Sequence, residues 1–462
     1  MGLVETNNHS YSVLKFLFLA ILFFGCQPET LNTLRVSEVN PRYFTDNSGK
    51  AIYLTGSHTW DNLVDINDPD QDTPFDYQAY LKFLKSYNHN FIRLWTWDLL
   101  TMCSENTMTL HYIPLHPWER AGEENALDGK PKFDLTRFNQ AYFDRLRERV
   151  EAAGSENIYV SVMLFEGWGL QFSLDGYRNH PFHPLNNVNQ LGLDTTQHSR
   201  FAIYELVNDN VTQLQERYLE KVIASIGDLD NVLYEISNEN HAGSTQWQYH
   251  MIRYIKEQEK ERGKAHPVGM TFQYKGGTNV DLFNSPADWI SPNPDGGYKN
   301  NPTSARGQKV ILTDTDHLWG IGGDREWVWK SFLRGLNPIF MDPYRDQVLV
   351  INRDEDWEKV RVSMRHTMEF AKKMDLINMV PEGSLATSEY CLASIGKEYL
   401  VYLAEQKETE LDLSAVGGTF DVSWFDSISG RTETGGTMTG GKKVRLVSPF
   451  ESNGGVAHLR LQ

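Results

Sequence analysis

Short apolar runs alternate with amphipathic helical segments along most of the chain, from about residue 51 to residue 376. The runs do not alternate apolar and polar residues, as strands of a sheet with one solvent-exposed face do. This lack of alternation is typical of parallel strands covered on both sides. The helical segments repeat apolar side chains every three or four positions, as in "FDYQAYLKFLKSYN" at residues 75–88. Strand candidates lie at residues 51–60, 90–99, 157–169, 231–241, 266–274, 287–297, 308–319 and 337–344.

Eight strand candidates separated by mostly helical segments predict an α/β fold, a (β/α)8 TIM barrel. Irregular loop insertions are expected at about residues 100–135 and 170–205. A doubly wound open sheet is the alternative, but no G-x-G-x-x-G turn follows the first strand. The fifth and sixth units are the weakest, because little helical sequence lies between or after them.

The pattern of the chain changes after Pro381. Runs such as "CLASIGKEYLVYLAEQ" at residues 391–406 and "KKVRLVSPF" at residues 442–450 are short and are bounded by Gly, Ser and Asn. These features are typical of an antiparallel all-β module. We therefore predict a barrel domain at residues 27–381 and a C-terminal β-sandwich domain at residues 382–462.

Residues 1–26 resemble the signal segment of a bacterial lipoprotein. The apolar stretch "KFLFLAILFFG" is too short to cross a bilayer as a folded helix. Cys26 follows directly, and in such signals the cysteine after a small residue is acylated and becomes the mature amino terminus. We therefore predict an exported protein of the bacterial cell envelope, in contact with a membrane only through a lipid anchor. Because Phe23 and Phe24 are bulky for this signal, an uncleaved anchor and ordinary secretion stay open.

Composition narrows the function further. Three cysteines are too few for a disulfide scaffold, and we expect Cys103 and Cys391 to be unpaired core residues. The chain has 61 acidic and 44 basic residues, a net charge of −17, and no basic run longer than a pair, so nucleic acid is not an expected partner. The 12 Trp, 21 Tyr and 23 Phe, many beside acids, are typical either of a carbohydrate-binding surface or of a well-filled core.

Polar and aromatic residues end the predicted strands, and in a parallel barrel these ends meet on one face. One example is "NVLYEISNENH" at residues 231–241, where an apolar predicted strand ends in a glutamate between two asparagines. The candidate site residues are His58, Trp60, Arg93, Trp95, Trp97, Glu166, Trp168, Asn238, Glu239, Tyr274, Asp295, Asp314, Asp316, His317, Trp319 and Asp342.

Two carboxylates across a cleft are what glycoside hydrolysis needs, one to protonate the leaving oxygen and one to attack the sugar or activate water. An Asn-Glu pair at the end of the fourth strand and an acid at the end of the seventh resemble the clan A glycoside hydrolases. The resemblance implies that Glu239 is the acid/base, Asn238 the ligand of the sugar 2-hydroxyl and Asp314 the nucleophile. It also implies that Arg93 orients the nucleophile.

A closer resemblance covers most of the chain. "RYFTDNSGKAIYLTGSHTWDNL", "DTDHLWGIGG" and "FLRGLNPIFMDPY" are similar to segments of the apiosidase-like proteins, the DUF4038-type barrels near glycoside hydrolase family 140. The appended module resembles the collagen-binding-type domain of those proteins. For this chain we expect the module to pack on the barrel or to bind carbohydrate rather than collagen.

The seventh strand departs from the clan, whose nucleophile is usually a glutamate. Asp314 and Asp316 lie on the same side of an extended strand, so either side chain could face Glu239. Asp314 is the first candidate and Asp316 the second. A retaining mechanism, the expected one, needs the carboxyl groups about 5–5.5 Å apart, and a larger separation favours inversion. Each aspartate could instead cap a helix, Glu239 could be a surface acid, and the tryptophans could be packing residues.

The histidines show no metal-binding spacing. His58, His241 and His317 form no H-E-x-x-H or comparable pattern, so we expect no catalytic metal, and no motif indicates a cofactor. His58 and His317 are expected to hydrogen-bond the substrate or neighbouring acids. Glu166 is a third acid of the site or an ion-pair partner of Arg93.

The sequence therefore predicts an exported glycoside hydrolase acting on plant or microbial polysaccharide. The alternative is a non-catalytic glycan- or matrix-binding protein of the cell surface, which the short acid of the seventh strand keeps open. An esterase is less well supported, because the chain has no G-x-S-x-G motif. No pattern specifies the sugar, endo or exo action, or the oligomeric state.

Overall fold

The computed structural model describes residues 1–2, 31–66, 74–103, 110–344 and 356–462. Nearly all of the predicted signal segment, with Cys26, lies outside the described residues. Within the described part, no helix is both long enough and apolar enough to cross a membrane.

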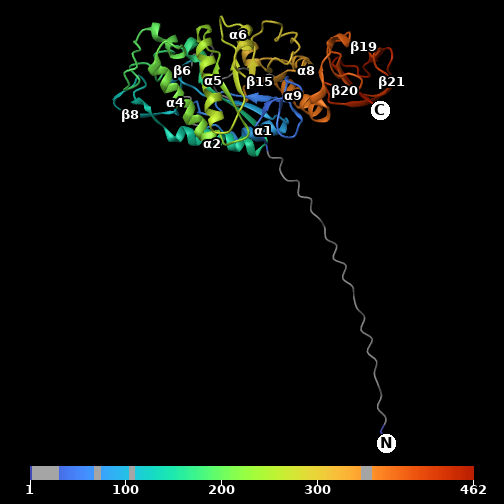
Figure 1. The fold of residues 1–462 in the computed structure, drawn as a ribbon, viewed down its shortest axis with the longest axis horizontal. Coiled ribbons are helices and arrows are strands. Elements are labelled where there is room, and N and C mark those ends of the chain that lie inside the picture. The colour runs from blue at the N-terminus through green and yellow to red at the C-terminus, as the bar shows by residue number, and fades with distance from the viewer. Residues whose placement is uncertain (3–30, 67–73, 104–109, 345–355) are drawn as a thin grey trace. The chain divides into compact units, whose positions relative to one another are not determined.

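Eight parallel strands form the central sheet, and they confirm the predicted TIM barrel (Figure 1). The first barrel strand β4 lies beside the last, β15, and on its other side the backbone N–H of Asn90 donates to the carbonyl of Thr55 at 3.0 Å. At this seam a Cβ on Gly56 would lie 2.0 Å from the carbonyl oxygen of Phe91, so only glycine allows the two strands to approach this closely. The strands are β4 (Gly56–His58), β5 (Phe91–Leu94), β10 (Tyr159–Glu166), β11 (Val232–Asn238), β12 (Val268–Thr271), β13 (Trp289–Ser291), β14 (Val310–Asp314) and β15 (Asn337–Met341).

Helices follow most of the strands and cover the barrel from outside. In α4, Leu214, Tyr218 and Val222 recur every fourth residue and are buried, which is the amphipathic spacing that the sequence shows. Short helices α3 (Trp168–Phe172) and α7 (Thr315–Leu318) begin directly at the ends of β10 and β14. The others are α1 (Tyr77–Ser86), α2 (Gln140–Ser155), α4 (Asp209–Ile226), α5 (Thr245–Glu261), α6 (Asn279–Asn284), α8 (Arg325–Leu333) and α9 (Asp356–Lys373).

The first insertion is not irregular, contrary to expectation. It contains two antiparallel hairpins, β6 (Thr101–Cys103) with β7 (Leu110–Tyr112) and β8 (Trp118–Asn125) with β9 (Pro131–Phe138). The sequence of β8, "WERAGEEN", is polar on both faces after its first residue, so it carries no hydrophobic period.

A small sheet precedes the barrel. Its strands are β1 (Arg35–Val36), β2 (Phe44–Thr45) and β3 (Ala51–Ile52), so the first half of the predicted first strand belongs to this sheet and only the second half to the barrel. Short 3-10 turns complete the barrel domain, at Gln197–Ser199, Phe201–Tyr204, Ala242–Ser244 and Leu376–Asn378.

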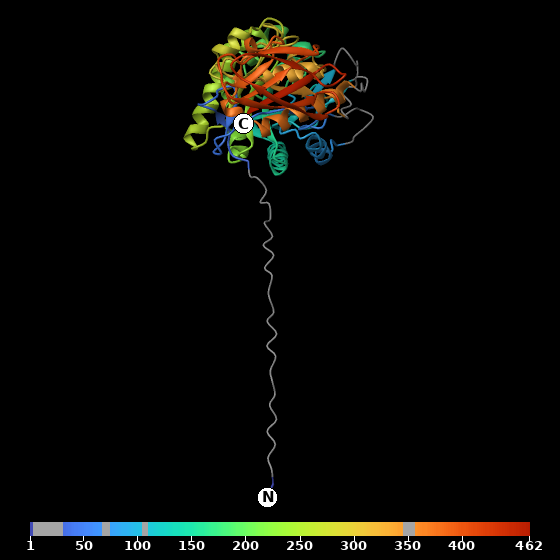
Figure 2. The ribbon, with the colours of Figure 1, turned by 90° about the vertical axis from the view of Figure 1, so that its right-hand side faces the viewer.

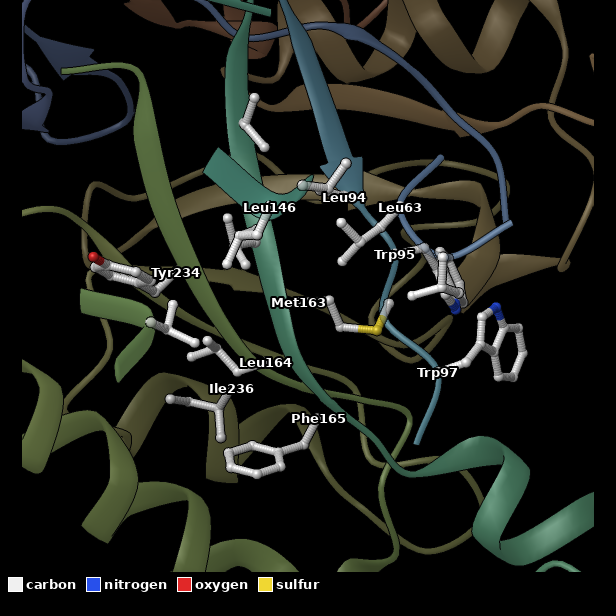
Figure 3. Close-up of a cluster of buried hydrophobic side chains, with 14 of the residues drawn as sticks. Leu63, Leu94, Trp95, Trp97, Leu146, Met163, Leu164, Phe165, Tyr234 and Ile236 are labelled. Atoms are coloured by element: carbon white, nitrogen blue, oxygen red, sulfur yellow. The ribbon is translucent and has the colours of Figure 1, made fainter. Parts of the chain in front are cut away.

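The main hydrophobic core lies between the barrel strands and the surrounding helices. Figure 3 shows part of it, with Leu164 from β10 beside Ile236 from β11. Because side chains of a strand alternate between its two faces, the same strands also supply the inner face of the barrel, where the polar site residues stand.

The C-terminal module is an antiparallel β domain, as predicted. Its two faces are both buried, because Tyr399 and Val401 point into the module core while Leu400 and Tyr402 belong to a second core shared with α8 and α9. Figure 1 shows the module beside these two helices, and Figure 2 shows its strands from the side that faces away from the barrel. Its six-stranded sheet is β16 (Val380–Pro381), β17 (Cys391–Ser394), β18 (Glu398–Tyr402), β23 (Gly455–Leu461), β20 (Thr419–Asp426) and β21 (Thr432–Thr439), and β19 (Glu408–Asp412) pairs with β22 (Lys443–Val447).

Candidate active site

A buried guanidinium connects the site acids across the barrel. Arg93 of β5 donates to both oxygens of Glu235 at 2.9 and 2.6 Å and to the side-chain oxygen of Asn238 at 2.6 Å. Its Nη1 donates to Asp314 and to Asp316, each at 2.9 Å. Three carboxylates therefore converge on one cation inside the barrel, where desolvation makes an uncompensated charge costly.

Asp314 is fully enclosed at the end of β14. Its two oxygens lie 3.0 and 2.9 Å from Nε2 of His58, and one of them accepts the backbone N–H of Asp316 at 2.9 Å, which caps α7. Burial opposes ionisation, but the positive field of His58 and Arg93 outweighs it and holds the pKa of Asp314 below its usual range. The helix-cap role that the sequence left open therefore applies to Asp314.

Asp316 and Glu239 are two buried acids of the site whose pKa values are both raised. Burial and the anionic Asp314 raise the pKa of Asp316 to about 6, against the lowering effect of Arg93. Burial raises the pKa of Glu239 well above its usual range, and the largest charge contribution to this shift comes from Asp316. The exposed fractions of Glu239 and Asp316 are 7% and 9%, whereas that of Asp314 is 0%. Both pKa values are therefore raised, and Glu239 has the larger upward shift.

Glu166 is a third buried acid at the end of β10. It accepts the backbone N–H groups of Trp168 and Gly169 at 2.8 and 2.7 Å, at the start of α3, rather than pairing with Arg93. Burial, with the charge of Asp98, raises the pKa of Glu166 to about 8. The charge of Glu166 also contributes to the raised pKa of Glu239.

His317 fixes the orientation of Asn238. Its Nδ1 lies 2.6 Å from the hydroxyl of Ser291, and its Nε2 lies 3.2 Å from the side-chain oxygen of Asn238. Burial, with Arg93 nearby, lowers the pKa of His317 to about 3, so the ring is neutral. The Asn238 oxygen accepts from both Arg93 and His317, which directs its amide N–H groups away from them. Among the described residues, no group of three or more His, Cys, Asp or Glu is arranged to hold a metal ion.

The structure separates four of the five candidate tryptophans. The exposed fractions of Trp95 and Trp97 are both 1%, and Figure 3 shows their rings just beyond the end of β5, so these two pack in the core and do not offer a ring face to a sugar. The expectation that they bind substrate is corrected accordingly. Trp60 lies over this pair, with ring centres 5.8 and 5.1 Å away, and the half-buried Trp168 lies 6.1 Å from Trp60.

Among the remaining candidates, Asp342 belongs elsewhere. It is fully buried, and both of its oxygens accept from the guanidinium of Arg361, which ties the end of β15 to α9. The expectation of substrate binding by Asp342 is therefore corrected to a structural role. Tyr274 and Trp319 are half-buried on the loops after β12 and α7, and Asp295 is exposed.

Sequence reasoning missed Glu235 and Gln171. Glu235 lies in the middle of β11 and accepts hydrogen bonds from Arg93. The sequence feature that could have identified it is a charged residue inside an otherwise apolar strand. Gln171 of α3 donates to the backbone carbonyl of Glu239 at 2.8 Å. This bond supports a strained residue, because the φ of Glu239 is +41°.

Residues 111–275 match the model of a family described as a domain of unknown function, DUF6298. No curated protein matches the chain. The resemblance to the apiosidase-like proteins stays a prediction.

Solved structures share the fold. A glycoside hydrolase family 5 protein from Bacteroides vulgatus has 13% identity and a TM-score of 0.60, with 93% of each chain covered. A glycoside hydrolase has 12% identity and a TM-score of 0.60, with 93% of this chain and 97% of that chain covered. A further protein of Bacteroides vulgatus has 11% identity and a TM-score of 0.62, with 93% and 82% covered. At these identities the similarity establishes the fold, a TIM barrel with an additional β domain.

Proposed function

We propose that the protein is a glycoside hydrolase in which Glu239 is the acid/base and Asp316 the opposing carboxylate. The observation that carries the proposal is the convergence of two buried acids, Glu239 directly after β11 and Asp316 at the β14–α7 junction: both pKa values are raised, and the charge of Asp316 adds to the upward shift of Glu239. Glycoside hydrolysis needs a pair of acids, one as proton donor and one as anion.

The geometry favours Asp316 over Asp314, which was the first candidate. Asp314 is fully buried, and both of its oxygens are held by His58, Arg93 and the α7 backbone. Asp316 has one oxygen on Arg93 and keeps a small exposed surface. Asp314 therefore positions Arg93 and α7, and Asp316 faces the substrate.

The proposed reaction follows the retaining route that the clan A resemblance implies. An Asp316 oxygen bonds to the anomeric carbon while the bond from that carbon to the leaving oxygen breaks, and Glu239 gives its proton to that oxygen. Water then attacks the same carbon, the Glu239 carboxylate takes a proton from the water, and the bond to Asp316 breaks. The Asn238 amide, fixed by Arg93 and His317, donates to the sugar 2-hydroxyl.

Two further observations support the proposal. The structural neighbours with TM-scores of 0.60 and 93% or more of each chain covered are named as glycoside hydrolases, one of them of family 5. The half-buried Trp168, whose backbone N–H donates to Glu166, lies 6.1 Å from Trp60 and supplies ring surface of the kind that stacks on sugars. Export and a lipid anchor at Cys26, as the amino-terminal segment predicts, are proposed together with this function.

The test is hydrolysis of an oligosaccharide panel by the parent protein and two variants. We expect reducing sugar to be released, and Glu239→Gln and Asp316→Asn each to lower kcat by about 100- to 10,000-fold. Glu148→Gln, the same change on an exposed position of α2, serves as the control and keeps the parent rate. Binding without turnover in the parent would instead establish the non-catalytic glycan-binding function.

A further inference from the structure

Three cationic side chains on loops at the carboxyl end of the barrel each lie over an aromatic ring. The pairs, with the distance from cation to ring centre, are Arg200 over Phe201 at 4.3 Å, Lys275 over Phe172 at 4.9 Å and Lys299 over Trp319 at 5.1 Å. Within the described residues none of the three cations makes an ion pair with a carboxylate. They stand on three different loops, after β10, β12 and β13.

The rings under two of these cations touch the loops that carry Glu239. Phe201 stacks on His241, with ring centres 4.3 Å apart, and His241 follows Glu239 by two residues. Phe172 stands next to Gln171, whose amide holds the Glu239 carbonyl at 2.8 Å. Arg200 and Lys275 are therefore each one aromatic ring away from the segments next to the proposed proton donor.

The third cation is linked in the same way to Asp316. Lys299 lies over Trp319, which follows Asp316 by three residues. The backbone N–H of Gly320 donates to the carbonyl of Asp316 at 3.1 Å, so Trp319 belongs to the same short turn as the acid. The three cations thus stand on loops that adjoin the segments carrying Glu239 and Asp316.

The missing carboxylate alone does not distinguish these three cations. Among the described residues, Arg361 and Arg120 lie over rings and have the carboxylate partners Asp342 and Asp128, whereas Arg253 lies over Tyr249 without one. What Arg200, Lys275 and Lys299 share is their position on loops at the carboxyl end of the barrel, where, within the described part of the chain, an anionic ligand would have no protein carboxylate to displace from them.

We propose that the substrate is an anionic glycan whose charged groups, uronate carboxylates or sulfate esters, bind Arg200, Lys275 and Lys299. This inference rests on the proposed hydrolase function and adds the substrate class to it. A net charge of −17 repels a polyanion, so cations fixed around the site are needed to concentrate such a substrate there. Aromatic rings hold the cations in place, and so little side-chain freedom is lost on binding.

The test is affinity electrophoresis of the full-length Glu239→Gln variant. The probes are polygalacturonate, glucuronoxylan and alginate, each before and after chemical reduction of its carboxyl groups, together with carrageenan as the sulfated polymer. We expect retention by at least one acidic polymer, weakened by salt. If carboxylates are bound, reduction of that polymer weakens retention about tenfold or more; if sulfate is bound, only carrageenan is retained.

Variants identify the cations. Arg200→Gln, Lys275→Gln and Lys299→Gln, singly and combined, should weaken retention of the acidic polymer, with a combined loss of about tenfold or more. Arg253→Gln is the matched control, because Arg253 lies over Tyr249 at 5.9 Å in the same way on the outer helix α5; this variant should bind as before. Thermal unfolding of each variant checks the fold, and the exposed Lys275 gives a single variant with little structural risk.

The outcomes separate this inference from the proposed function. If no acidic polymer is retained, or if Arg253→Gln weakens retention as much as the triple variant, the inference is overturned. Hydrolysis of neutral oligosaccharides without preference for acidic ones leaves the hydrolase proposal standing and removes the substrate class. If Arg200, Lys275 and Lys299 retain an acidic polymer but the parent protein releases no sugar, the anionic ligand class stands and the hydrolase proposal is removed.

Discussion

Asp314 and Asp316 are two residues apart, yet their surroundings shift their pKa values in opposite directions. His58 and Arg93 keep Asp314 ionised against the effect of burial, whereas burial beside Asp314 raises the pKa of Asp316 to about 6. Asp314 thus adds to the effect of burial on Asp316, and Asp316 in turn raises the pKa of Glu239. Asp314 and Asp316 accept hydrogen bonds from Arg93, whose charge also lowers the pKa of Glu239, so the three acids form a series of linked ionisations around Arg93.

This series predicts a bell-shaped pH dependence of kcat/KM. Activity requires ionised Asp316, so it rises with pH through about 6, and it requires protonated Glu239, so it falls only above the raised pKa of that residue. The measurement is kcat/KM between pH 4 and 10 on a substrate without titrating groups. A rate that is constant between pH 5 and 7 contradicts the assignment of Asp316.

The two aspartates also differ in what their replacement does to stability. Asp314→Asn removes the buried anion that His58 and Arg93 face, and breaking a buried ion pair costs about 3–5 kcal/mol of unfolding free energy. Asp316→Asn should lower kcat strongly with a much smaller loss of stability, because Arg93 keeps Glu235 and Asp314. Urea unfolding and kinetics on both variants check this, and equal destabilisation by the two changes speaks against the separate roles.

At the scale of elements, most barrel strands and helices could be predicted because the barrel buries both faces of each strand and one stripe of each helix. Burial of this kind leaves a hydrophobic period in the sequence. The hairpin β8–β9 was not predicted because β8 is polar on both faces after its first residue, although β9 alternates and buries Phe133 and Leu135. Glu239 and Arg93 could be predicted as site residues because they lie at the ends of predicted strands. The choice of Asp316 over Asp314 as the catalytic carboxylate depends on hydrogen bonds that no sequence pattern encodes.

The seam between β4 and β5 supplies a prediction for a single element contact. Gly56→Ala places a methyl group 2.0 Å from the backbone carbonyl of Phe91, and backbone cannot move aside as a side chain can. We expect a loss of about 3 kcal/mol of unfolding free energy from this overpacking, measured by urea titration. Gly417→Ala, where a Cβ has no neighbour within 4 Å, is the control and should be close to neutral. An equally small effect at Gly56 argues against closure of the barrel at this seam.

At the scale of the whole molecule, a shared apolar core joins the barrel to the β module. Trp329 of α8 is fully buried there, stacks on Tyr402 with ring centres 5.9 Å apart, and lies 5.8 Å from Phe425. Because apolar burial rather than a few polar contacts holds the two parts, we expect the barrel and the module to unfold together in one cooperative transition.

Trp329→Ala tests this coupling. Removing the ring should cost about 3–5 kcal/mol and should separate unfolding into two transitions, because the cavity lies in the shared core. Trp247→Ala removes a fully buried tryptophan from the barrel core and is the matched control. It should destabilise the barrel by a similar amount, so any splitting specific to Trp329→Ala reports the interface and not simply the loss of a large side chain. Calorimetry, together with tryptophan fluorescence and far-ultraviolet circular dichroism during urea unfolding, resolves the transitions. A single coincident transition in Trp329→Ala means that the two parts are coupled by contacts other than this core.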